Sequence, residues 1–144
     1  MRKMKIYFAG AIRGGREDVE LYLKMVELLR PYGAVLTEHI ADEQLTSLGE
    51  ANDDQSIHDR DLAWLKQADC LVAEVTTPSL GVGFEIGKAT EWGLRVLCLF
   101  RPSSGRALSA LIAGSNRVTV REYQSAADVA EIFEDYFLSQ KAES

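Results

Sequence analysis

Residues 70–87 read Cys70-Leu-Val-Ala-Glu-Val75, then Thr76, then Thr77-Pro-Ser-Leu-Gly-Val-Gly-Phe-Glu-Ile-Gly87. The apolar run predicts a buried strand, and the prolyl and glycyl residues after it predict a turn into a helix. We expect that helix to begin at Gly83 and to carry Glu85 in its first turn. A helix that starts after a parallel strand presents free backbone N–H groups, which suit a bound anion. Glu85 is then either a carboxylate that stabilises the helix start or a catalytic group beside that anion.

The rest of the chain alternates between strand-like and helix-like segments. Apolar runs predict strands at 5–9, 34–37, 70–75, 95–100 and, at a sheet edge, 117–120. Helical spacing of apolar residues predicts helices at 17–32, 54–68, 83–92, 107–113 and 126–138. This alternation predicts a single α/β domain over residues 1–144, a doubly wound, Rossmann-like five-stranded parallel sheet flanked by helices. Ligands of such sheets bind at the carboxyl ends of the strands.

Composition restricts the class of partner. The 144 residues carry a formal net charge of −6, with 47% hydrophobic and 26% charged residues, which is ordinary for a soluble globular protein. The acidic balance disfavours nucleic acid and anionic membranes as partners, and no apolar run reaches the roughly 20 residues of a membrane span. Cys70 and Cys98 lie in apolar runs without metal-site spacing, and His39 and His58 are the two histidines. We therefore expect buried free thiols, a reducing, cytoplasmic location and no metal site.

Two carboxylates fall on the apolar faces of predicted helices. At about 100° per residue, Asp61 lies within the apolar stripe of the helix at 54–68, and Glu85 lies on the inward face of the helix that follows. The stripe consists of Ile57, Trp64, Leu65 and Ala68, and the inward face consists of Val82, Ile86, Ala89 and Trp92. A buried aspartate must be paired, hydrogen-bonded or next to a cavity, so a structural and a functional role for Asp61 both stay open. Paired carboxylates suit hydrolysis of a glycosidic bond, in which one attacks the anomeric carbon and the other assists the leaving group.

The turns near these carboxylates add polar groups. Residues 10–15 match neither a dinucleotide fingerprint nor a P-loop, and we expect no cofactor. Arg13 in this turn can bind a phosphate through two hydrogen bonds, although a solvated loop arginine is the commoner case. Tyr7 lies in the first strand, where a buried hydroxyl needs a partner that an inward glutamate can supply. Ser79 is a candidate helix N-cap, and no Ser/His/Asp or Cys/His triad is evident.

Several short motifs occur in one order along the chain. They are Tyr7-Phe-Ala-Gly-Ala-Ile-Arg-Gly-Gly-Arg-Glu-Asp18, Val35-Leu-Thr-Glu-His39, Asp61-Leu-Ala-Trp-Leu65, Val72-Ala-Glu-Val75, Pro78-Ser-Leu-Gly-Val-Gly-Phe-Glu-Ile-Gly87, Leu97-Cys-Leu-Phe-Arg-Pro102 and Leu108-Ser-Ala110. With these motifs the chain resembles the 2′-deoxynucleoside 5′-phosphate N-hydrolases, relatives of the nucleoside 2-deoxyribosyltransferases. The resemblance covers nearly the whole chain up to Arg117.

The resemblance implies hydrolysis of the N-glycosidic bond of a 2′-deoxynucleoside 5′-monophosphate to a free base and 2-deoxyribose 5-phosphate. Glu85 would attack C1′ and form a covalent sugar ester, which water would then hydrolyse. Tyr7 would hold that carboxylate through a hydrogen bond, and Asp61 would protonate the departing base. The carboxylate of Glu85 would also occupy the space that a 2′-hydroxyl needs.

The resemblance further implies a set of substrate-binding residues. They are Gly10, Ile12, Arg13, His39, Ser79, Gly81, Gly83 and Ser109. Ile12 and His39 would flank the base, and the 5′-phosphate would be bound by Arg13, Ser79, Ser109 and the backbone from Gly81 to Gly83. Ser109 would reach the phosphate from a neighbouring subunit, which makes the active unit a homodimer. Ala11 departs from the family pattern of a phosphate-binding serine, and one lost hydrogen bond to a charged oxygen would cost about 1.5–3 kcal/mol.

Three alternatives stay open. Ala11 favours a ribonucleotide N-glycosidase that cleaves cytidine monophosphate. A nucleoside 2-deoxyribosyltransferase would use unphosphorylated nucleosides and pass the sugar to a second base, against which Arg13, Ser79 and Ser109 argue. A non-catalytic nucleotide-binding module would have little use for two inward carboxylates near an anionic ligand.

Overall fold

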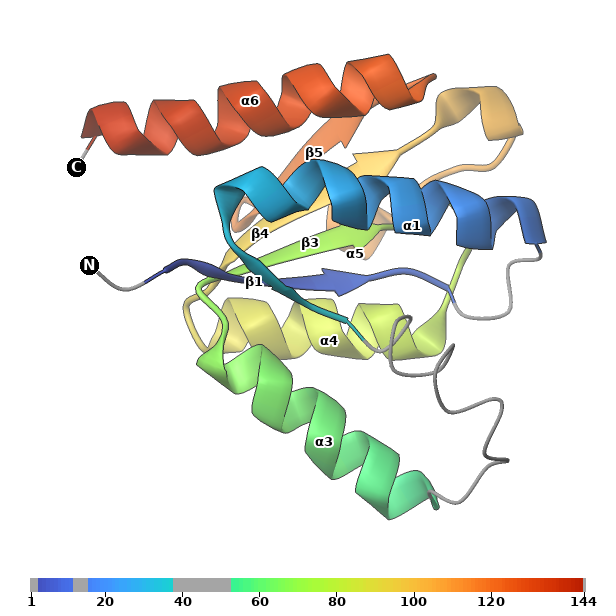
Figure 1. Ribbon diagram of the computed structural model, residues 1–144. Coiled ribbons are helices and arrows are strands. Elements are labelled where there is room, and N and C mark those ends of the chain that lie inside the picture. Colours follow the sequence, from blue (N-terminus) through green and yellow to red (C-terminus); the bar gives the residue numbers. More distant parts are fainter. Residues whose placement is uncertain (1–2, 12–15, 38–52, 144) are drawn as a thin grey trace.

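The computed structural model describes residues 3–11, 16–37 and 53–143 (Figure 1). The elements in chain order are β1 (Lys5–Ala9), α1 (Arg16–Leu29), the 3-10 helix η1 (Arg30–Tyr32), β2 (Ala34–Leu36), α3 (Asp54–Gln67), β3 (Cys70–Glu74), α4 (Leu80–Glu91), β4 (Arg95–Phe100), the 3-10 helix η3 (Pro102–Ser104), α5 (Ala110–Ala113), β5 (Val118–Glu122) and α6 (Ala126–Glu143). Among the described residues, no helix combines the length and the apolar character that crossing a membrane requires.

The strands form one parallel sheet in the order β2-β1-β3-β4-β5, which confirms the predicted fold class. Helices α1 and α6 cover one face of the sheet, and α3 and α4 cover the other (Figure 1). The strand order reverses direction between β1 and β3, so a crevice is expected where these two neighbouring strands end.

Both faces of the three central strands, β1, β3 and β4, are buried, as is usual for parallel strands. Alternate residues of β1, β3 and β4 belong to two separate hydrophobic cores. Phe8 and Val72 face α1 and α6, whereas Tyr7 and Leu71 face α3 and α4. Tyr7 is completely buried and therefore directs its hydroxyl into the layer that contains α4.

Helix α4 begins three residues earlier than predicted. The Ser79 side chain accepts a hydrogen bond from the Val82 N–H at 3.2 Å and so caps the helix, which starts at Leu80. This cap and the burial of Val82 outweigh the low helix propensity of the glycines at 81 and 83. The prediction that Glu85 lies in the first turn was wrong, because Glu85 is the sixth residue of α4. Its position is therefore not explained by the positive charge at the helix start.

The two cysteines are buried without a disulfide, as the apolar runs around them predicted. Burial raises the pKa of both the Cys70 and the Cys98 thiol to about 12. Neither thiol is therefore a reactive nucleophile near neutral pH.

Candidate active site

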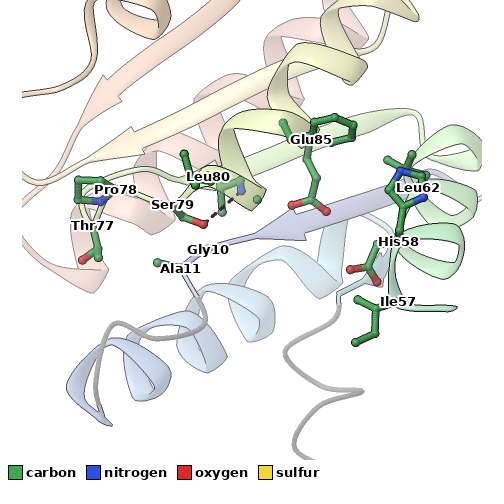
Figure 2. Close-up of a pocket in the computed structure, with 14 residues that line it drawn as sticks. Gly10, Ala11, Ile57, His58, Leu62, Thr77, Pro78, Ser79, Leu80 and Glu85 are labelled. Atoms are coloured by element: carbon green, nitrogen blue, oxygen red, sulfur yellow. Dashed lines mark hydrogen bonds between the residues drawn. The ribbon is translucent and has the colours of Figure 1, made fainter. Parts of the chain in front are cut away.

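A cavity of about 620 Å³ lies at the carboxyl ends of β1 and β3 (Figure 2). The segment after β1 contributes Gly10 and Ala11, and the turn after β3 contributes residues 77–79. The first two turns of α4 and the face of α3 that carries Asp61 complete the described wall. Figure 2 shows the turn residues on one side, the α3 residues on the other, and the carboxylate of Glu85 between them.

Glu85 and Tyr7 form the centre of this cavity. Glu85 is only 6% exposed, and its Oε2 accepts a hydrogen bond from the Tyr7 hydroxyl, which joins α4 to β1. Burial raises the pKa of Glu85 to about 7, the hydrogen bond from Tyr7 opposes this rise, and the charge of Asp61 adds to it. A carboxyl group with a pKa near the working pH is typical of a group that reacts or transfers protons.

Asp61 is buried on α3 and lines the same cavity. The Nε atom of Arg60 donates a hydrogen bond of 3.0 Å to its Oδ1 atom. The guanidinium of Arg60 also lies 5.0 Å from the centre of the Trp64 ring, which orients it. Both expectations for a carboxylate on this apolar face are met, because Asp61 is paired with an arginine and borders a cavity.

The other end of the cavity suits an anion. The N–H groups of Leu80 and Gly81 lie in the first turn of α4, where no intrahelical acceptor is available, and both residues line the cavity. Gly10 lies across from them, and a Cβ atom there would come within 3.0 Å of the Tyr22 ring. A glycine at this position therefore lets the chain after β1 pass close to α1.

The structure brings most of the predicted residues together. Glu85, Asp61, Gly10, Ser79 and Gly81 line the cavity, and Tyr7 contacts it through Glu85. Gly83 and Ser109 lie outside the lining. The Gly83 N–H donates to the Ser79 carbonyl at 3.0 Å, and the exposed Ser109 caps α5 by accepting from the Leu111 N–H at 3.3 Å. Ile12, Arg13 and His39 lie outside the described residues.

Three residues that the sequence analysis did not select belong to this region. His58 and Phe84 line the cavity with their ring centres 6.0 Å apart, and Glu74 is a buried carboxylate at the end of β3. His58 lies one helical turn before Asp61, so the helical spacing could have indicated it. Phe84 directly precedes Glu85 and is half exposed, which no periodic pattern indicates.

Glu85→Gln is expected to raise the free energy of unfolding at pH 8 by up to about 3 kcal/mol. The pKa of Glu85 is about 7 in the folded protein, whereas the ordinary pKa of a glutamate, expected in the unfolded chain, is 4.5. Wild-type stability therefore falls as pH rises through this window, and a glutamine does not titrate there. Urea unfolding from pH 4 to 8 measures the difference, with the exposed Glu131→Gln as control. A difference between Glu85→Gln and wild type that is independent of pH would contradict the assignment.

Comparison with known proteins places the chain among close relatives. Residues 6–128 match the nucleoside 2-deoxyribosyltransferase family. A 5-hydroxymethyl-dUMP N-hydrolase of Tetraodon nigroviridis is 51% identical, with 96% of this chain and 100% of the relative covered. The Rattus norvegicus protein of the same name is 54% identical, with 96% and 90% covered. Among solved structures, a 2-deoxyribosyltransferase of Bacillus psychrosaccharolyticus aligns with a TM-score of 0.66 at 20% identity over 88% of this chain and 90% of that one, which shows the shared fold.

Proposed function

The chain belongs to the nucleoside 2-deoxyribosyltransferase family, and from this premise we propose that it is an N-glycosidase of 2′-deoxynucleoside 5′-monophosphates. The products would be a free base and 2-deoxyribose 5-phosphate. The observation that carries the proposal is the pairing of Glu85 with Tyr7 beside Asp61, in a cavity that ends at a helix start whose N–H groups suit an anion. The names of the two relatives describe hydrolysis of a phosphorylated deoxynucleotide, which supports this substrate class.

The groups that line the cavity favour one orientation of the bound nucleotide. The phosphate would lie against Ser79 and the N–H groups of residues 80 and 81, since these are the anion-binding groups of the described wall. The sugar C1′ would then lie at Glu85. The base would extend toward α3, between His58 and Phe84, where the wall becomes aromatic and apolar. Figure 2 shows Ser79 and Leu80, then Glu85, then His58 in this order across the cavity.

The reaction would proceed in two steps. Ionised Glu85 attacks C1′ while the bond to the base nitrogen breaks, and Asp61 gives its proton to the departing base. Water then attacks C1′, the ester bond to Glu85 breaks, and the Asp61 carboxylate accepts the proton of the water. The Tyr7 hydroxyl holds Glu85 in place for both steps. Since Glu85 must be ionised to attack, kcat/KM should rise with pH through about 7.

We also propose a homodimer in which Ser109 of one subunit contacts the phosphate in the other. Ser109 is exposed and lies outside its own cavity lining. The neighbouring Leu111 is 89% exposed, and Leu80 at the cavity is 96% exposed. Large exposed apolar side chains of this kind are typical of surfaces that bind another chain.

The two buried free thiols fit a reducing compartment, and the cytoplasm is the proposed location.

An HPLC screen of ribo- and deoxynucleoside monophosphates, including 5-hydroxymethyl-dUMP, tests the proposed function. We expect base release from deoxynucleoside monophosphates and a kcat/KM at least about 100-fold lower for the unphosphorylated deoxynucleosides, which lack the charge-assisted contacts of the phosphate. Cytidine monophosphate as the best substrate would favour the ribonucleotide alternative. Transfer of the sugar to an added base would favour a transferase, and binding without base release would favour a non-catalytic module.

A further inference from the structure

Glu74 is a buried carboxylate that the proposed reaction does not use. It ends β3 and is only 2% exposed. By strand alternation it shares the side of Cys70 and Val72, which face α1 and α6. Glu74 therefore lies on the opposite side of the sheet from Tyr7, away from the carboxylates of the cavity.

Every described hydrogen bond to the Glu74 carboxylate comes from the ends of neighbouring segments. Its Oε1 accepts from the Thr76 N–H at 2.8 Å, and its Oε2 accepts from the Thr76 hydroxyl at 2.7 Å and from the Tyr123 hydroxyl. The Thr76 Oγ1 atom in turn accepts from the Arg101 N–H at 2.9 Å. We call Glu74, Thr76, Arg101 and Tyr123 the Glu74 cluster. It connects the turn after β3 with the residues that directly follow β4 and β5.

The Glu74 cluster holds the turn that leads into the cavity. Thr76 is followed directly by residues 77–79, which line the cavity, and the last of them, Ser79, caps α4. The next residue is held from α1, because the Thr77 hydroxyl donates to Asp18 Oδ2 at 3.2 Å. Asp18 lies 3.9 Å from an Nη atom of Arg101. The turn is thus fixed by two carboxylates, and the hydroxyl of Thr77 is directed to Asp18.

A buried carboxylate is expensive unless donors compensate it, and here three donors do. Such an arrangement suits an anchor of fixed geometry, because a group that transfers protons needs access to the substrate. The backbone N–H of Thr76 is among these donors, so Glu74 holds the main chain of the turn directly.

We propose that Glu74 is a positioning residue for phosphate binding. By fixing Thr76, it holds the turn in the conformation that presents Ser79 and the first N–H groups of α4 to the substrate phosphate. This role rests on the proposed function, since it assigns the phosphate to that turn.

Thr76→Val and Thr76→Ser are the matched pair that tests this role. Valine keeps the shape of threonine and removes the hydroxyl that joins Glu74 to Arg101, whereas serine keeps the hydroxyl. We expect Thr76→Val and Glu74→Gln to raise KM for the deoxynucleoside monophosphate by about 10-fold, with kcat within about threefold of wild type. Thr76→Ser should restore the wild-type KM. The inhibition constant of 2-deoxyribose 5-phosphate should rise in parallel with KM, and that of the free base should not change.

Val129→Ala controls for loss of stability. Val129 is fully buried in the core between α6 and the sheet, away from the cavity, so truncation lowers the unfolding temperature without moving the turn. A KM in Glu74→Gln and Thr76→Val that matches Val129→Ala would overturn the positioning role. An equal effect on the free base would also overturn it. If the wild type releases no base from any monophosphate, the proposed function and this role fail together, whereas an active wild type with unchanged variants removes this role alone.

Discussion

Glu85→Gln is expected to lower kcat for base release by at least about 10⁴-fold, because an amide does not replace a carboxylate as the attacking group. The substitution keeps the shape of the side chain, and the amide oxygen can still accept the hydrogen bond from the Tyr7 hydroxyl. The loss should therefore appear in kcat, while 2-deoxyribose 5-phosphate binds the variant as it binds the wild type.

Rapid acid quenching followed by intact-mass spectrometry tests the role of Glu85 by detecting the covalent intermediate. The wild type should carry a deoxyribosyl phosphate adduct during turnover, and Glu85→Gln should not. Glu91→Gln is the matched control, because Glu91 is an exposed carboxylate at the end of the same helix. Base release by Glu85→Gln at more than a few per cent of the wild-type rate would exclude Glu85 as the nucleophile.

Asp61→Asn is expected to lower kcat by about 10²–10⁴-fold, the usual contribution of a positioned acid. Asparagine can still accept the hydrogen bond from Arg60 Nε, so the local structure should persist. The loss should be largest for bases that leave poorly and smallest for bases that leave without protonation. Asp59→Asn is the matched control, since Asp59 is an exposed carboxylate on the same helix.

The pH profile of kcat/KM provides a second readout for Asp61. In the proposed reaction Asp61 carries its proton while Glu85 is ionised, so Asp61→Asn should lower kcat/KM and leave the acid limb, which follows Glu85, in place. Tyr7→Phe should move the same limb to higher pH, because the hydrogen bond from Tyr7 lowers that pKa. A loss of kcat in Asp61→Asn that is equal for all leaving bases, or an acid limb that moves to lower pH, would leave Asp61 only its structural pairing with Arg60.

The expected stability gain of Glu85→Gln and its expected loss of activity have one physical origin. Burial makes the ionised carboxylate unfavourable in the folded protein, so the group lowers stability above its pKa. The same burial keeps water from competing for the carboxylate and leaves it able to attack the sugar. The measurements of unfolding and of base release therefore examine a single property of Glu85.

The periodicity of apolar residues was sufficient to predict the parallel sheet and the inward direction of Asp61 and Glu85. These features depend on apolar residues that recur every 2 residues in strands and every 3.6 residues in helices, and this spacing can be read directly from the sequence. The order of several motifs was likewise sufficient for the family. The predicted start of α4 was wrong. The Ser79 cap stabilises the helix start more than the glycines at 81 and 83 destabilise it, and helix propensity alone does not include the cap.

Contacts between distant segments were decided only by the tertiary structure. Tyr7 and Glu85 are 78 residues apart, and their contact exists because β1 pairs with β3, the strand that leads into α4, and Tyr7 faces the side that α4 covers. Glu74 and Tyr123 are 49 residues apart and meet because β3 and β5 flank β4 as parallel strands and end at the same edge of the sheet. Strand order and burial depend on how the whole chain packs, and the pKa of Glu85 follows from that burial. The sequence by itself thus determined that Asp61 and Glu85 turn inward, and the packing of the sheet determined that both line one cavity and that Glu74 is buried on the opposite side of the sheet.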